Sequence, residues 1–313
     1  FGSLTINSGG EYKAPSGTTT ITSMTSTGSG DRSLNNKSGG TFTNNDGTVL
    51  FNSSSDQRME MAGTGNVHNL TINKSDNDLV TFGNLTIEGD LSITTDTTHT
   101  MRPNNASETL TVTGSVTIVE GKLGDVTNYT GAISFGGLEI QSGGEYIATS
   151  GTTTITNKIS SGTYTNYMFQ NAGTFTHNNG TVHWKADTSS GTWFAMNGSL
   201  PLTNTEFYNI STERVRASGT EQYRFWTGGS GRFLTVLNNI DIGANTRLFS
   251  SNGSGNFRND GICDISGILN IVNVTTVNMG AVTIESGGEL EFGDGNSVNV
   301  EGIRNVGGTV TVT

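Results

Sequence analysis

The sequence "FGSLTINSGGEYKAPSGTTTIT" occupies residues 1–22 and returns as "FGGLEIQSGGEYIATSGTTTIT" at residues 135–156. The two segments align without a gap, and 17 of their 22 positions are identical. A weaker third version, "GAVTIESGGELEFGDG", begins at Gly280. Self-similarity at a long, fixed period is typical of repeat proteins, in which each unit packs on its neighbours.

The second version continues beyond the opening motif. The segment "SGGTFTNNDGTVLF" (38–51) returns as "NAGTFTHNNGTVHW" (171–184). We therefore predict one long repeat at residues 1–134, a second at residues 135–278 and the start of a third at residues 279–313. The chain begins at the head of a repeat, and we expect it to be a mature product or a fragment of a longer array.

Within each repeat, apolar residues occur in pairs separated by one residue, such as Leu4/Ile6 and Val49/Phe51. A period of two places one face of a β-strand inward. Between the pairs lie clusters such as "NSGG" and "NNDG", which supply the positive-φ residues of tight turns. No segment combines a 3.6-residue apolar period with helix caps. The pattern predicts an all-β chain with short strands and Gly/Asn-rich turns.

Strands with only two or three inward residues need neighbours to bury them, and a coiled chain provides these neighbours. We predict a single-chain, right-handed parallel β-solenoid, also called a β-helix. The alternative is a row of β-sandwich domains, each the length of one long repeat. Sandwiches require antiparallel hairpins and linkers, yet the apolar pairs run straight through residues 134 and 278. The solenoid is therefore the favoured prediction.

Composition narrows the function classes. The net charge is −11, which argues against nucleic-acid binding because such proteins need a basic surface. No run of 18 apolar residues is present, so we predict no membrane span. Cys263 is the only cysteine and lies in the alternating run "GICDISGILNIV", where we expect it to pack in the core.

The segments "GTFTNNDGTVLFNSSSDQ", "HNLTINKS" and "GNLTIEGDLSI" resemble the β-helical repeats of bacterial surface adhesins and filaments and of phage fibres. In those arrays, similar blocks alternate over long chains. The resemblance covers nearly all of the two full repeats. It implies an extracellular protein of the virion surface or the bacterial cell surface, with a structural or adhesive role. The shared positions are turn glycines and core aliphatics, so the resemblance transfers no functional residue.

Some β-helices, including phage tailspikes, are polysaccharide-degrading enzymes with two or three carboxylates on adjacent coils. One acid follows "SGG" in every version of the opening motif and is interpreted as solvated charge: Glu11, Glu145 and Glu289. Asp264, Glu206 and Glu213 are unpaired in sequence, although adjacent coils could bring them together. We predict that the chain is not an enzyme, and a tailspike-like polysaccharide depolymerase is the alternative.

Metal motifs are incomplete. The four histidines lack zinc-binding spacing: His68, His99, His177 and His183. The pair His177 and His183 flanks the turn "NNG" and is interpreted as a solvated pair. The segments "NNDG" and "FGDGNS" resemble fragments of calcium loops but complete no known calcium motif. We expect no cofactor, and calcium on the acidic surface stays an open alternative that no motif supports.

Residues 183–233 depart from the pattern as an aromatic and Arg-rich insertion. All three tryptophans and four arginines lie there, whereas residues 50–82 of the first repeat contain no Trp, no Tyr and one Arg. Such side chains suit stacking on sugars, gripping of acidic glycans or docking of a partner chain. The alternative is that the aromatics fill a wider core. The candidate binding residues are Trp184, Trp193, Tyr223, Arg224 and Trp226.

Together these observations predict a non-enzymatic structural and adhesive segment of an extracellular fibre. The fibre would be a phage tail or capsid fibre, or a bacterial surface filament or adhesin. The expected partners are a cell-surface polysaccharide or receptor, together with other fibre subunits or further copies of the same chain.

Overall fold

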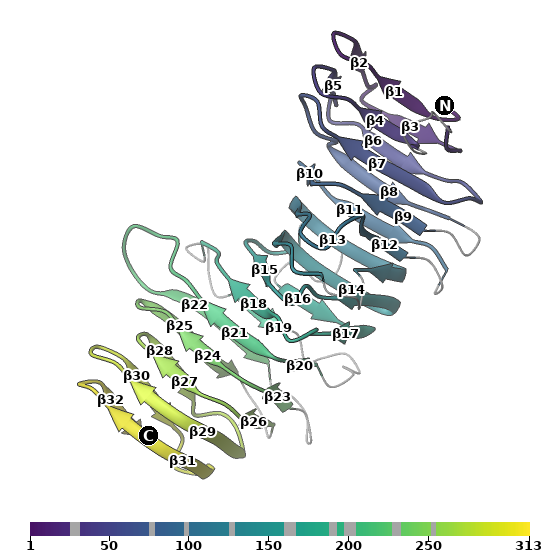
Figure 1. The fold of residues 1–313 in the computed structure, drawn as a ribbon. Helices are drawn as coiled ribbons and strands as arrows, with labels where there is room; N and C mark the ends of the chain where they lie inside the picture. The colour runs from purple at the N-terminus through teal and green to yellow at the C-terminus, as the bar shows by residue number, and fades with distance from the viewer. Residues whose placement is uncertain are drawn as a thin grey trace. The chain divides into compact units, whose positions relative to one another are not determined.

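The computed structural model describes residues 1–25, 32–74, 79–96, 100–124, 129–159, 167–187, 193–196, 205–226, 233–251 and 255–313. These residues form strands, turns and bends, and no helix occurs among them (Figure 1). The all-β prediction is therefore confirmed.

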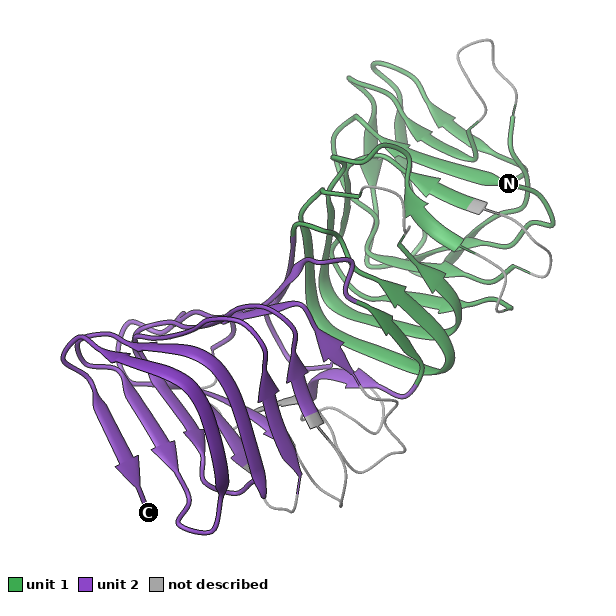
Figure 2. Ribbon diagram, turned by 60° about the horizontal axis from the view of Figure 1, so that its bottom comes forward, with its two compact units in different colours: residues 1–151, 173–176 green, residues 152–172, 177–313 purple. Residues whose placement is uncertain are grey.

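The chain forms two compact units, residues 1–151 with 173–176 and residues 152–172 with 177–313 (Figure 2). The strands of the first unit are β1 (Leu4–Ile6), β2 (Glu11–Lys13), β3 (Thr18–Ile21), β4 (Leu34–Asn36), β5 (Thr41–Thr43), β6 (Thr48–Phe51), β7 (Gln57–Met61), β8 (Asn69–Ile72), β9 (Leu79–Phe82), β10 (Leu85–Ile87), β11 (Leu91–Thr94), β12 (Thr100–Pro103), β13 (Leu110–Leu123), β14 (Ile133–Ile147) and β17 (Thr174–Thr176). The strands of the second unit are β15 (Thr152–Ile155), β16 (Tyr167–Asn171), β18 (Thr181–Trp184), β19 (Trp193–Met196), β20 (Glu206–Phe207), β21 (Asn209–Thr212), β22 (Glu221–Trp226), β23 (Phe233–Val236), β24 (Ile240–Ile242), β25 (Thr246–Ser251), β26 (Asn256–Asn259), β27 (Cys263–Ile265), β28 (Ile268–Ile271), β29 (Thr276–Ile284), β30 (Glu289–Phe292), β31 (Ser297–Asn305) and β32 (Thr309–Val312).

Within each unit, strands from successive coils pair in parallel. In the first unit, β3, β6, β8 and β11 form one such ladder, and its register stacks Ile21, Phe51, Ile72 and Ile93. All four side chains are at most 1% exposed. Each unit is thus a parallel β-solenoid, as predicted, because a sandwich would require antiparallel pairs.

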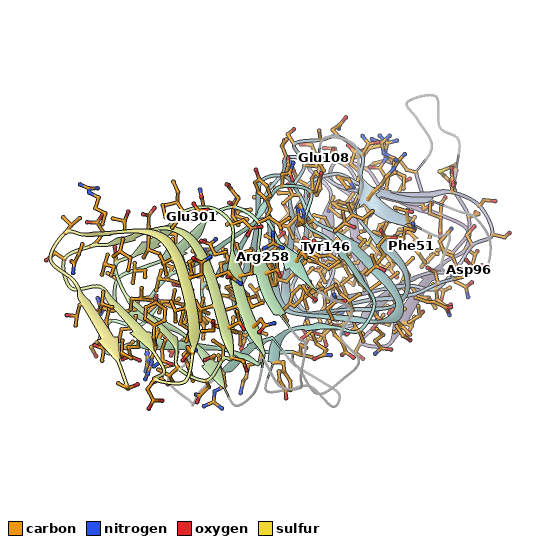
Figure 3. The ribbon with its side chains drawn as sticks, turned by 90° about the horizontal axis from the view of Figure 1, so that it is seen from below. Phe51, Asp96, Glu108, Tyr146, Arg258 and Glu301 are labelled. Atoms are coloured by element: carbon orange, nitrogen blue, oxygen red, sulfur yellow. The ribbon has the colours of Figure 1, made fainter. Side chains whose placement is uncertain are left out.

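The core of each unit is a set of such inward columns. Phe51 and Tyr146 of the first unit point into the interior and are fully buried (Figure 3). Glu301 of the second unit is exposed and points outward in the same view. Cys263 is also fully buried, which confirms the prediction that its thiol packs in the core.

Strand length differs from the prediction in four places. Most strands have two to six residues, but β13 and β14 have 14 and 15, and β29 and β31 have nine. These strands stay paired around a corner of the coil, and β13 does so with register shifts between Val112 and Ser115 and between Ile118 and Glu120. Shifts of this kind bend a strand without ending its ladder. Because β14 and β29 run through residues 134 and 278, a strand occupies both predicted repeat boundaries.

The repeated turn sequences form the same turn in both repeats. Asn45 and Asp46 have φ values of 48° and 57°, and the equivalent Asn178 and Asn179 have 46° and 59°. Two successive residues in the left-handed region are typical of a type I′ turn, which favours Asn, Asp and Gly. The recurrence of Asn and Asp at these turn positions therefore has a conformational cause.

Candidate functional site

Two of the predicted binding residues lie in the core of the second unit. Trp184 ends β18 and is 2% exposed, with its ring edge-on to Phe207 at 5.7 Å between centroids. Tyr223, in β22, is fully buried, and its hydroxyl accepts a hydrogen bond from the Ala186 amide and donates one to the Glu213 carbonyl. Burial raises the pKa of Tyr223, so the hydroxyl keeps its proton. Neither side chain can contact a glycan in this conformation.

The side chains of two other predicted residues lie outside what the structure describes. Trp193 begins β19 and Trp226 ends β22, but the described residues exclude the side chains of both. Their role as binding residues stays a prediction.

Arg224 is the predicted residue that the structure places on the outer surface. Its strand alternates, so Tyr223 and Phe225 are buried while Arg224 is half-buried and faces the opposite side. In register with it on β25 lies Phe249, which is also half-buried. The Arg224 Cζ atom lies 5.0 Å from the Phe249 ring centroid, within the range of a cation–π contact.

A second arginine contacts the same ring. The Arg247 Cζ atom lies 5.3 Å from the Phe249 centroid, and Arg247 Nη2 lies 3.1 Å from Glu291 Oε2. Asn270 donates a hydrogen bond to the same Glu291 oxygen. We call these five residues, Arg224, Arg247, Phe249, Asn270 and Glu291, the arginine–aromatic face.

The arginine–aromatic face combines an apolar ring with guanidinium groups. A planar guanidinium that stacks on a ring keeps its edge N–H groups directed sideways, where they match carboxylate or sulfate oxygens. Glu291 balances the positive charge of Arg247. This arrangement can hold the apolar face of a sugar against Phe249 and an acidic substituent against arginine.

A column of polar side chains runs along another ladder of parallel strands in the same unit. The register of β18, β21, β24 and β27 aligns His183, Ser211, Asp241 and Asp264 in that order. We call these four residues the polar column. Residues in register on neighbouring strands lie about 4.8 Å apart. The column therefore places an imidazole, a hydroxyl and two carboxyl groups from four coils next to one another.

Of the three acids that are unpaired in sequence, Asp264 and Glu213 have neighbours in this column. Asp264 is in register with Asp241, and both are exposed. Partial burial of the Asp241 carboxyl group raises its pKa, and the Asp264 charge raises it further. Glu213 binds Lys185 Nζ at 2.8 Å and His183 Nε2 at 3.1 Å, while Glu206 is exposed on β20.

The "SGGE" acids behave as surface charges. Glu11 is exposed and lies 3.5 Å from Lys13, and the Glu145 carboxylate lies 2.9 Å from Lys122 Nζ. Glu289 is half-buried and accepts a hydrogen bond from Thr311.

The histidines have separate surroundings. His177 Nδ1 accepts a hydrogen bond from the Asn179 amide, and its ring stacks on Tyr208. It thereby repeats the role of Asn44, whose side chain accepts from the Asp46 amide in the first repeat. His68 lies 3.6 Å from Asp46, and His99 lies outside the described residues. In the part of the chain that the structure describes, no three His, Cys, Asp or Glu side chains form a metal-binding group.

Sequence reasoning missed Arg247, Phe249 and Ser211. Phe249 and Arg247 lie beyond the aromatic insertion, and their signal is the alternation in "TRLFSS", which places both on the face opposite Leu248. Ser211 has no local signal, because its partner His183 lies 28 residues earlier.

Comparisons with known proteins return no match: no protein-family model, no curated protein and no solved structure matches this chain. Among the described residues there is also no helix long and apolar enough to cross a membrane.

Proposed function

We propose that this chain is a structural and adhesive segment of an extracellular fibre, either a phage tail or capsid fibre or a bacterial surface filament or adhesin. The parallel solenoid supports the proposal, because stacked coils add length by repetition and need no catalytic pocket. The resemblance of the repeat blocks to those of surface proteins and phage fibres points to the same role.

The arginine–aromatic face carries the adhesive part of the proposal. Its Phe249 ring suits the apolar face of a sugar, and Arg224 and Arg247 suit acidic groups. The ligand class that fits this chemistry is an acidic cell-surface glycan. Because charge contributes, binding should weaken as salt rises.

Calorimetric titration with polygalacturonate, a uronic-acid polymer, and with neutral dextran tests the proposal. We expect polygalacturonate alone to bind, and Phe249→Ala or Arg224→Gln to weaken it at least about tenfold, equal to 1.4 kcal/mol. Thr283→Ala, on the strand ladder that joins β27 to β29 in the same unit, is the matched control and should bind like the wild type. Equal binding of both polymers, or unchanged binding by the two variants, would contradict the proposal.

Self-association through β31 and β32 is part of the same proposal. Ile303 and Val310 are 48% and 42% exposed, although their register partners Val282 and Leu290 are buried. Apolar side chains of this kind favour stacking of another coil, and the occupant that we propose is a second copy of the chain. Sedimentation velocity should show oligomers that Val310→Lys reduces and Thr311→Lys leaves unchanged. A monomer at all concentrations would exclude self-association.

The alternative, a polysaccharide depolymerase, is favoured by one observation. Asp241 and Asp264 lie on neighbouring strands, and the raised pKa of Asp241 suits a general acid. Reducing ends released from a polysaccharide by the wild type, and lost in both Asp241→Asn and Asp264→Asn, would support it. Release that survives both substitutions, or its absence in the wild type, would remove it.

A further inference from the structure

Three side chains of the second unit form a hydrogen-bonded row next to the carboxylate pair. His183 Nδ1 and Ser211 Oγ lie 2.7 Å apart, and His183 Nε2 lies 3.1 Å from Glu213 Oε2. The row is a consequence of the fold, since β18 and β21 pair in register and Glu213 follows Ser211 by two residues on the same face. The imidazole thus has a hydroxyl on one nitrogen and a carboxylate on the other.

The charges around the row determine which nitrogen carries the proton. The hydrogen bond from Lys185 lowers the pKa of Glu213 most, so its carboxyl group stays ionised and accepts hydrogen bonds only. Its neighbour Nε2 must therefore be the protonated nitrogen of the neutral imidazole. The lone pair on Nδ1 then faces the Ser211 hydroxyl and can accept its proton. A nucleophile, a base and a group that orients the base are in place.

We propose that Ser211 is the nucleophile of an ester-cleaving site, with His183 as its general base. Ser211 Oγ attacks the ester carbonyl carbon as its proton moves to His183 Nδ1. The alcohol leaves with that proton, and the acyl group remains on Ser211. Water then attacks the acyl group and gives one proton to His183 Nδ1, which returns it to Ser211 as the carboxylic acid is released. Glu213 and Lys185 are positioning residues.

The surroundings of Ser211 define the substrate class. Ser211 is half-buried and the His183 side chain is 19% exposed, so the row is open to an acyl group carried on a larger molecule. Asp241 is in register with Ser211 on the far side from His183 and disfavours a negatively charged acyl group. The substrate that fits is a short, neutral ester such as an O-acetyl group. The proposal does not depend on glycan binding by the arginine–aromatic face.

Two probes on the chain of residues 1–313 test this activity. A fluorophosphonate should label Ser211, as located by peptide mass spectrometry, and leave Ser92 unlabelled. Ser92 is the matched control, because it is a half-buried outward serine whose register partners are Thr71 and Thr117. Hydrolysis of p-nitrophenyl acetate should fall at least about 100-fold in Ser211→Ala and in His183→Gln.

The positioning role of Glu213 has its own readout. Glu213→Gln should change the pH profile of hydrolysis, because the neutral amide no longer enforces the proton on Nε2. Label on Ser211 no greater than on Ser92 would overturn the proposal, and so would hydrolysis unchanged in Ser211→Ala. Because the label is read on the wild type, the result stands even where a variant folds poorly. Titration with polygalacturonate on the same samples separates failure of this site from failure of the adhesive role.

Discussion

Replacing Trp184 separates a core role of the aromatic segment from a binding role. Truncation of a buried tryptophan to alanine costs about 3–5 kcal/mol, and Trp184 is 2% exposed. Its Nε1 atom is buried and has no hydrogen-bond partner among the described residues, which costs about 1–3 kcal/mol. Trp184→Phe removes that orphan N–H and introduces the residue that the first repeat has at the equivalent position, Phe51. We therefore expect Trp184→Phe to stay within about 1 kcal/mol of the wild type.

Thermal unfolding followed by circular dichroism measures both variants. In a unit of this size, 1 kcal/mol shifts Tm by about 2–4 °C, so Trp184→Ala should lower Tm by roughly 6–20 °C. Trp184→Phe should lower it by less than about 4 °C and should bind polygalacturonate like the wild type. If Trp184→Ala kept its Tm but lost glycan binding, Trp184 would be a surface residue and the packing argument would be refuted.

Three further perturbations test the turns, the ion pairs and the core. Gly65 has a φ of 90°, and a Cβ there would lie 1.9 Å from the Phe42 carbonyl oxygen, so Gly65→Ala should cost at least about 2 kcal/mol in urea unfolding. Gly17→Ala, which meets no atom within 4 Å, should change stability by less than about 0.5 kcal/mol. The pKa of Glu213 is lowered, so its ion pair with Lys185 stabilises the fold above the ordinary pKa of 4.5. This stabilisation is lost as the pH falls through the lowered pKa of the folded state. The Tm difference between wild type and Glu213→Gln should therefore be present at pH 6 and shrink as the pH falls below 4.5, and a difference that stays constant with pH would count against the pair. Burial raises the pKa of the Cys263 thiol, so a thiol reagent should react only as urea unfolds the chain, and fast reaction of the native protein would place the thiol at the surface.

The fold was predictable because its two determinants are local. Alternating apolar pairs define inward faces, and the turn residues define where the chain reverses. The turn at Asn45 and Asp46 shows this directly, since the similar segments "NNDG" (44–47) and "HNNG" (177–180) both form a positive-φ pair, the second at Asn178 and Asn179. The long strands β13 and β14 were not predictable, because a bulged strand that stays paired around a corner looks like two short strands in sequence.

The site was less predictable because composition does not say which face a side chain occupies. The alternation of side chains along a strand predicts part of this. In "EQYRFW", Tyr223 and Phe225 must share one face and Arg224 must lie on the other. The alignment of Phe51 with Trp184 likewise indicated an inward tryptophan. Ranking residues by aromatic and Arg content, without their alternation, selected two core residues as surface candidates.

The register of the inward pairs determines which outward side chains become neighbours. Val182 pairs with Ile210 28 residues later and Ile210 with Ile240 30 residues later, whereas Cys263 pairs with Val282 after only 19. The register of the inward side chains also sets the register of the outward ones. A shift of one residue in strand pairing would expose all the apolar side chains of a strand. His183 therefore meets Ser211 for the same reason that Val182 meets Ile210, and surface chemistry on this fold follows from the register of its core.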